Sequence, residues 1–290
     1  MRPSITDFLN YTFTLPPLRQ GIDFFEGESA SLLCMDLLLN QRVGVERATA
    51  AALAIHYHFG KPIAGLEGKI IEVTKWPYAG IKIRAPGRHL CNLVSGHLQN
   101  RDPVKISLSQ LPDSAVGALG SLERYYNRSN LFFAPLRRIE LAPETIRAIT
   151  IDKFREITEL NFPQKNLPKQ LSAVATLLEM KKVPSRPSRA ALKAQERIGD
   201  EAADTLLVYL FKERALIVDE YLRRILYRHF FIDSPKKSTQ AIEQLLGPFV
   251  KTYDEAHKLH ARINEVGELY CLAKEPNCGN CPFNRFEHRV

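Results

Sequence analysis

The spacing of apolar residues predicts helices over most of the chain. From residue 28 to residue 60, apolar positions recur at helical intervals with Ser29 as a candidate N-cap, and the pattern breaks softly at RVGVE. We therefore expect two helices joined by a tight turn. Helical patterns return at Pro143 and continue almost to the C-terminus. The first 25 residues differ, because apolar and polar residues alternate in YTFTLPPL, which is typical of an extended arm.

The segment 61–140 has a different pattern. Short β-branched runs such as KIIEV and IKIRA lie among Gly and Pro residues, which predicts strands and turns. The segment holds twelve Lys and Arg residues and six Asp and Glu residues, so it carries +6 of the formal net charge of +8. This charge favours a polyanionic partner, with a solvated basic surface as the alternative. In SLERYYNRSNLFF, the aromatic residues near Arg124 and Arg128 suit either nucleic-acid contact or the core.

The composition is that of a globular protein. The chain has 290 residues, 45% of them hydrophobic and 25% charged, which is enough for two compact lobes. It contains no run of eighteen apolar residues, and its start lacks the blocks of a signal peptide, so we expect a cytoplasmic protein without a membrane partner, nucleoid-associated in a prokaryote. Three of the five cysteines lie in the last 21 residues, which favours thiol ligands over disulfides. His56 and His58, and His257 and His260, occur in pairs two or three residues apart on predicted helices, as surface pairs usually do, and we assign them no metal role.

The segment RAALKAQERIGDEAADTLLVYLFKERALIVDEYLRRIL carries the clearest local pattern. It predicts a helix, a turn at Ile198 and Gly199, a second helix from Asp200 to about Phe211, and a third helix opened by VDEYLRR. A glycine turn before a helix leaves backbone N–H groups that can bind phosphate. Asp219 stands at the start of the third helix, where the free N–H groups and the helix dipole favour a carboxylate. Taken alone, Asp219 is a helix cap.

Several segments resemble the helix-hairpin-helix DNA glycosylases of the endonuclease III superfamily. The family hairpin LPGVGRKTAN is followed after about twenty residues by VDTH, and AALKAQERIGDEAAD and IVDEYLRR fall into this pattern without gaps. Cys271, Cys278 and Cys281 match the first three positions of the family motif Cys-x6-Cys-x2-Cys-x5-Cys. LLLNQRVGVERATAAA resembles the helix pair near the family's N-terminus, and ITELNFPQKNLPKQLSAVATLL resembles the helix before the hairpin. The resemblance covers roughly residues 28–60 and 142–290.

The resemblance implies a mainly α fold of two lobes, the helix-hairpin-helix glycosylase fold, with an inserted, partly β segment. We expect an N-terminal extension at 1–25, a lobe with the hairpin formed by 26–60 and 141–213, the basic insert at 61–140, and a C-terminal helical lobe with the cysteine loop at 214–290. It also implies that the protein, as a monomer, binds double-stranded DNA and excises a flipped modified or mispaired base.

The resemblance assigns roles to individual residues. Asp219 matches the carboxylate that stabilises the oxocarbenium character of the sugar during base release. Gln41 matches the residue that fills the gap left by the flipped base. The residues expected to contact DNA are Gln41, Arg197, Ile198, Gly199 and Asp200.

Two departures from the family pattern change the expected chemistry. Members that also cut the backbone carry a lysine where this chain has Glu201, and a carboxylate cannot form a Schiff base. We therefore expect a monofunctional glycosylase without lyase activity. The family's Pro-Gly pair is Glu196-Arg197 here, so a glycine is missing, and the Arg197 guanidinium can replace its phosphate contact. A weakened hairpin also fits an alternative, a non-catalytic protein that recognises distorted or damaged duplexes on a glycosylase-derived fold.

The cysteine loop departs from the family pattern at its last position. Glu287 stands where the fourth cysteine is expected, and His288 follows it. Three interpretations are open: a [4Fe–4S] cluster with Glu287 or His288 as the fourth ligand, a zinc ion held by the three cysteines and His288, or no metal. The spacing of the cysteines favours the cluster.

Overall fold

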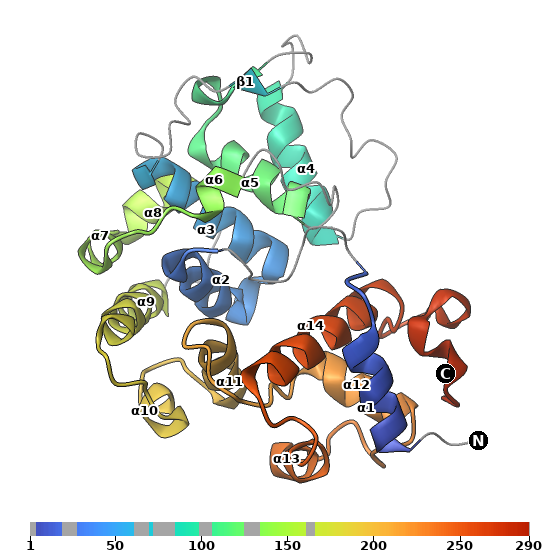
Figure 1. Cartoon of the computed structure of the whole chain (residues 1–290). Coiled ribbons are helices and arrows are strands. Elements are labelled where there is room, and N and C mark those ends of the chain that lie inside the picture. Colours follow the sequence, from blue (N-terminus) through green and yellow to red (C-terminus); the bar gives the residue numbers. More distant parts are fainter. Residues whose placement is uncertain are drawn as a thin grey trace. The chain divides into compact units, whose positions relative to one another are not determined.

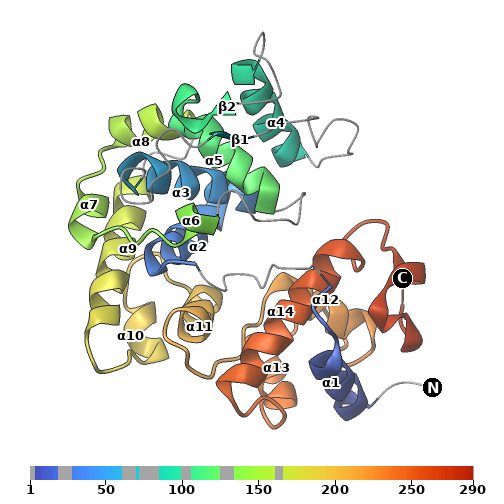
Figure 2. The same ribbon diagram turned by 45° about the horizontal axis from the view of Figure 1, so that its top comes forward.

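The chain forms two compact, mainly helical units in a computed structural model, shown in Figures 1 and 2. The central unit comprises Phe25–Ile198, and the terminal unit comprises Met1–Phe24 together with Gly199–Val290. The mainly α fold class is thereby confirmed. The structure describes residues 4–18, 28–60, 70–71, 85–98, 106–124, 134–160 and 166–289. Within these ranges no helix has the length and apolar character needed to span a bilayer.

The central unit is built on a pair of closely packed helices, α3 and α5. A Cβ atom added to Gly117 of α5 would lie 2.2 Å from the carbonyl oxygen of Ala50 in α3, so only glycine permits this approach. Small residues line both helices and allow the backbones to come together. The described elements of the unit are α2 (Ala30–Val43), α3 (Val45–Gly60), β1 (Ile70–Ile71), α4 (Ala85–Leu98), β2 (Ile106–Ser107), η1 (Leu108–Gln110), α5 (Asp113–Leu122), α6 (Ala134–Arg137), α7 (Pro143–Arg147), α8 (Ile151–Thr158), α9 (Leu167–Lys182) and α10 (Arg189–Lys193).

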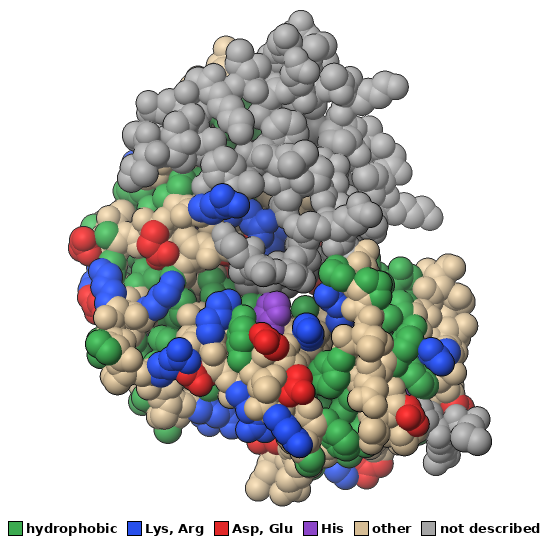
Figure 3. All heavy atoms as spheres, viewed as in Figure 1, with side chains coloured by type: hydrophobic (Ala, Val, Ile, Leu, Met, Phe, Trp, Pro, Cys, Tyr) green, Lys and Arg blue, Asp and Glu red, His purple; other side chains and the backbone are tan. Residues whose placement is uncertain are grey.

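The segment 61–140 shows little of the expected β structure in its described part. Its described strands, β1 and β2, have two residues each and pair antiparallel. Helices α4 and α5 account for most of the rest, and α5 packs on α3 within the same compact unit. The run IKIRA lies outside the described residues, as do most of the basic residues of the segment. On the face drawn in Figure 3, the described Lys and Arg side chains are interspersed with Asp and Glu.

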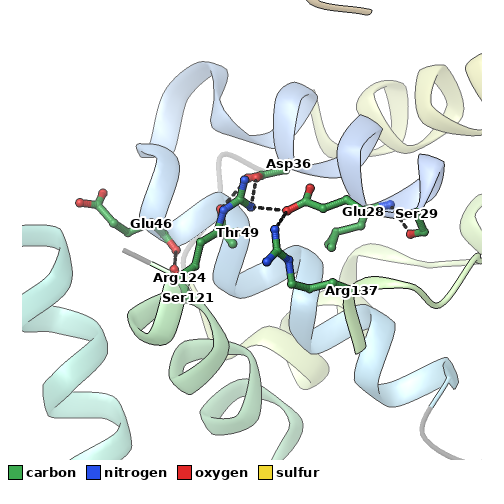
Figure 4. Close-up of polar contacts among 9 residues, drawn as sticks. Glu28, Ser29, Asp36, Glu46, Thr49, Ser121, Arg124 and Arg137 are labelled. Atoms are coloured by element: carbon green, nitrogen blue, oxygen red, sulfur yellow. Dashed lines mark hydrogen bonds and ion pairs between the residues drawn. The ribbon is translucent and has the colours of Figure 1, made fainter. Parts of the chain in front are cut away.

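A buried ion-pair cluster closes the core of the central unit (Figure 4). The Arg124 guanidinium, only 2% exposed, lies 2.9 Å from Asp36 Oδ2 and 3.0 Å from Glu28 Oε1. Arg137 Nη2 donates to the same Glu28 oxygen at 2.8 Å, and Thr49 Oγ1 donates to Asp36 Oδ1 at 2.7 Å. The Arg124 guanidinium therefore holds the end of α5 against α2 inside the protein. The aromatic residues of SLERYYNRSNLFF lie outside the described residues, so their role stays a prediction. Arg128 lies outside the described residues.

The terminal unit contains an N-terminal helix where the sequence predicted an extended arm. Helix α1 (Ile5–Thr14) begins at the N-cap Ser4, whose Oγ accepts from the Asp7 N–H group, and its face of Phe8, Leu9 and Thr12 is buried. The prediction was wrong because the alternating run YTFTLPPL covers only the last turn of this helix and its exit. The other described elements of the unit are α11 (Asp200–Tyr209), α12 (Glu220–Arg228), α13 (Thr239–Leu246), α14 (Tyr253–Leu269), η4 (Cys278–Asn280) and η5 (Pro282–Arg285).

Helix α14 organises the terminal unit. Helices α1, α11 and α12 all contact it, and α1 and α12 lie beside it in both ribbon views (Figures 1 and 2). After α1 ends, the Leu18 N–H group donates to Glu265 Oε2 at 3.2 Å, and Arg262 Nε donates to the carbonyl oxygen of Leu15 at 3.1 Å. The described N-terminal residues thus pack within this unit. The boundary between the units falls after Ile198, so α11 groups with α12 and α14, whereas the expected boundary followed residue 213.

His56 in the central unit makes stability depend on pH. Its Nδ1–H donates to the Ala52 carbonyl oxygen at 2.7 Å, Ser31 Oγ lies 2.8 Å from Nε2, and burial lowers the pKa of His56 to about 4 from 6.5. Above pH 6.5 both folded and unfolded His56 are neutral. Between pH 6.5 and 4 only the unfolded chain binds this proton, so the free energy of unfolding falls as the pH falls.

We expect His56→Gln to flatten this pH dependence. The free energy of unfolding of the native chain, measured by urea denaturation, should fall between pH 6.5 and 4 by roughly 3 kcal/mol more than that of the variant. His97→Gln is the matched control, because His97 on α4 is about one-third exposed, at 34%. If the free energy of unfolding fell equally with pH in the native chain and in His56→Gln, His56 would not be the source of the pH dependence.

Candidate active site and cysteine loop

Asp219 is the N-cap of α12 and is almost fully buried. Its Oδ1 accepts from the Leu222 N–H group at 2.7 Å, and the residue is 7% exposed. The buried side chains of Ile217 and Val218 fix the chain just before the cap, and the buried face of α12 follows it. The carboxylate therefore has one oxygen held by the helix and a second oxygen left for other contacts.

The second oxygen of Asp219 faces a histidine that the sequence analysis set aside. Asp219 Oδ2 lies 3.6 Å from His260 Nε2. The same imidazole is held by Tyr209, whose Oη lies 2.7 Å from Nδ1, and by Asn264, whose Nδ2 lies 2.8 Å from Nε2. Tyr209 comes from α11, His260 and Asn264 from α14, and Asp219 from the start of α12. A surface pair was therefore the wrong interpretation of His260, and the spacing of four residues to Asn264 was the available signal in the sequence.

Glu201 is electrostatically coupled to Asp219. It lies in the first turn of α11 with an exposed side chain, and its backbone carbonyl oxygen accepts from Thr205 Oγ1. Partial desolvation by the surrounding protein, followed by the negative charge of Asp219, raises the pKa of Glu201, while His260 and Arg223 oppose this shift. A carboxyl group with a raised pKa beside a second carboxylate can exchange a proton, as paired acids do in glycoside hydrolysis.

The hairpin residues divide between two roles. Gly199 is the N-cap of α11 with φ −85°, and both Gly199 and Asp200 are exposed, so the first N–H groups of α11 face solvent. Ile198 is buried. Arg197 has φ 73° and donates through Nη2 to Asn166 Oδ1, a contact that holds its guanidinium within the central unit. Gln41 lies in α2, but its side chain is outside the described residues.

Three cysteines line one hollow at the end of the terminal unit. The wall of the hollow is formed by Arg228, His229, Tyr270, Cys271, Cys278, Cys281, Phe283, Asn284 and His288. All three cysteines are free thiols, and Arg228 Nη1 donates to Cys271 Sγ at 3.1 Å. In the described part of the chain, no three His, Cys, Asp or Glu side chains are gathered closely enough to hold a single metal ion. Three cysteine side chains are the type of donor that iron–sulfur clusters bind as thiolates.

Two curated proteins match about a third of the chain at 30% identity. One, from Methanocaldococcus jannaschii, has a name that places it among the DNA repair glycosylases, and the match spans 98 residues, 34% of this chain and 44% of that protein. The other is endonuclease III of Sulfolobus acidocaldarius, matched over 93 residues, 32% of this chain and 41% of that protein. The chain therefore spans less than half the length of each relative. No protein-family model matches the chain.

The N-cap at Asp219 should contribute measurably to the free energy of unfolding. Asn caps a helix about as well as Asp, whereas Ala cannot accept the Leu222 N–H group, so Asp219→Ala should lower the free energy of unfolding by about 1 kcal/mol and Asp219→Asn by much less. Urea denaturation of the three proteins at pH 7 measures the difference. If Asp219→Ala and Asp219→Asn lost the same free energy of unfolding, the N-cap hydrogen bond would not be the stabilising contribution of Asp219.

Proposed function

From the resemblance to the endonuclease III superfamily, which both relatives confirm, we propose that this protein is a DNA N-glycosylase. It hydrolyses the N-glycosidic bond of a flipped modified or mispaired base in double-stranded DNA, without a Schiff-base lyase step. The observation that carries the proposal is the placement of Asp219, which combines the family's VD motif with a fixed carboxylate next to His260 and Glu201.

The proposed chemistry rests on the two carboxylates. As the bond between the sugar and the base breaks, its electron pair leaves with the base and the sugar becomes positively charged. Asp219 Oδ2 stabilises this charge, since Oδ1 is already held by the Leu222 N–H group. Water adds to the sugar carbon and gives its proton to Glu201, whose raised pKa makes it a stronger base, and the departing base takes up a proton in turn.

Glu201 also explains why we exclude the lyase step. A lyase of this superfamily attacks the sugar with an amine at this position, and a carboxylate cannot form the imine. In this chain the position instead holds a group that can activate water. Release of the base should therefore leave the DNA backbone intact.

DNA binding draws on the start of α11. The exposed N–H groups after Gly199 and the positive end of the helix dipole suit a phosphate. Arg197 supports the turn through Asn166 rather than presenting its guanidinium at this helix end, so it acts on binding indirectly. We propose binding to duplex DNA by a single copy of the chain.

The cysteine loop supplies the proposed cofactor. We propose that Cys271, Cys278 and Cys281 bind a [4Fe–4S] cluster, because the three thiols line one hollow and their spacing matches the superfamily motif. Bound there, the cluster would tie the loop to the end of α14. A single zinc ion and an empty loop are the alternatives.

We expect base release to depend on both carboxylates. Duplex oligonucleotides that carry alkylated, deaminated or oxidised bases are incubated with the protein, and the free base is quantified in single-turnover conditions. Asp219→Asn should lower the rate on the best substrate by at least about 100-fold, and Glu201→Gln by about 100-fold. Borohydride added during the reaction should trap no covalent complex with DNA, since no amine attacks the sugar.

Glu220→Gln is the matched control, because Glu220 is also an acidic residue of the first turn of α12 but its side chain is exposed, at 86%. It should release the base at nearly the native rate. Duplex binding without release of any base would favour the alternative of a non-catalytic protein that recognises distorted DNA. A trapped covalent complex would overturn the monofunctional mechanism.

A further inference from the structure

We propose that His288 is the fourth ligand of the iron–sulfur cluster, through Nε2. The inference rests on the proposed cofactor, but it does not depend on the proposed glycosylase reaction. It distinguishes His288 from Glu287, which occupies the position of the superfamily's fourth cysteine.

The position of His288 on the hollow is the first argument. His288 lines the same hollow as Cys271, Cys278 and Cys281, and Glu287 does not. The backbone carbonyl oxygen of Glu287 is turned to His229, whose Nδ1–H donates to it at 3.3 Å. One residue beyond the expected position, the chain therefore brings an imidazole to the wall where the three thiols lie.

The hydrogen bonding of His288 leaves the correct nitrogen for a metal. Its Nδ1 lies 2.9 Å from the carbonyl oxygen of Phe286, and because a carbonyl can only accept, Nδ1 carries the proton. In the neutral imidazole, Nε2 then keeps its lone pair. Ligating histidines usually donate the other ring N–H to a backbone carbonyl or a carboxylate, which fixes the tautomer and the ring orientation. The hydrogen bond to Phe286 thus selects the tautomer that a ligand bound through Nε2 needs.

The residues on both sides of His288 are anchored. The Phe286 ring packs against Phe8 and Tyr11 of α1, with ring centroids 5.6 and 5.5 Å apart. The Arg289 N–H group donates to the Arg228 carbonyl oxygen at 2.8 Å, and its guanidinium lies 4.0 Å from the centre of the Tyr227 ring. These contacts hold the imidazole at the hollow before any metal binds, so little ordering is required on binding.

The surroundings suit a negatively charged cluster. Arg228 Nη1 donates to Cys271 Sγ at 3.1 Å, and a hydrogen bond from a cation stabilises a thiolate and adjusts the reduction potential of a cluster. His229 forms another part of the wall, but its ring packs against Phe8 and Phe283, with centroids 5.6 and 5.9 Å away. We assign His229 to the wall and His288 to the metal.

The test uses the full chain, purified without oxygen and reconstituted with ferrous iron and sulfide. The native protein should contain about four irons per chain and show thiolate–iron charge-transfer absorption in the visible. His288→Ala should lose at least about one iron and give the paramagnetic signal of a three-iron cluster on oxidation. His288→Cys should regain the full iron content with a lower reduction potential, since a thiolate donates more charge than an imidazole.

Glu287→Gln is the matched control and should have the iron content and spectrum of the native protein. Circular dichroism checks that each variant is folded, and if His288→Ala fails to fold, the shift in potential of His288→Cys decides. Native iron content and spectrum in His288→Ala, or loss of iron in Glu287→Gln alone, would overturn the ligand assignment. One zinc ion per chain without iron, or no metal after reconstitution, would overturn the cluster. Iron content is measured without DNA, so this test is independent of the proposed glycosylase reaction. A protein that binds a cluster but releases no base would refute the glycosylase proposal and leave the ligand assignment intact.

Discussion

The terminal unit depends on satisfying one buried carboxylate. A carboxylate that is nearly removed from water costs several kcal/mol unless hydrogen-bond donors or positive charge compensate. At Asp219 the Leu222 N–H group supplies such a donor to one oxygen at 2.7 Å. His260 Nε2, which accepts from the Asn264 amide, lies 3.6 Å from the other oxygen. Tyr209 in turn holds the imidazole. The starts and faces of three helices, α11, α12 and α14, therefore meet at this group, and the same contacts that stabilise the fold orient the oxygen proposed to act on the sugar.

The two ends of the chain are joined by a cluster of aromatic rings in the terminal unit. Phe8 of α1 contacts Phe283 and Phe286 of the cysteine loop, with centroids 4.7 and 5.6 Å away, and also contacts His229 at the end of α12. Helix α1 therefore packs, through Phe8, against Phe283 and His229, which line the hollow. The N-terminal residues, for which the sequence suggested no partner, stabilise the part of the chain that carries the candidate cofactor site.

The sequence predicts features whose signals are local, and it does not predict contacts between residues that are far apart along the chain. The cap at Asp219 was predictable, because a Val-Asp pair before a helical pattern is a local signal. Helix α5 was not, because its Ala, Gly and Ser residues give a weak apolar pattern although they allow the close contact of Gly117 with α3. The buried contacts of His260 and Arg124 could not be predicted because their partners lie far away in the sequence. Only the fold brings His260 to Asp219 and Arg124 to Glu28 and Asp36.

Two of the three departures from the superfamily pattern differ in the chemistry they allow. At the lysine position a carboxylate cannot form a Schiff base, so in the proposed mechanism Glu201 excludes the lyase step and accepts a proton from water. At the fourth cysteine position Glu287 is not among the residues that line the hollow, and the neighbouring imidazole of His288 is. An imidazole can replace a thiolate as an iron ligand, as it does in Rieske centres, with a change in potential rather than loss of the metal. In the proposed mechanism, substitution therefore changes the reaction at the first position, whereas at the second position a neighbouring residue could preserve the proposed cofactor.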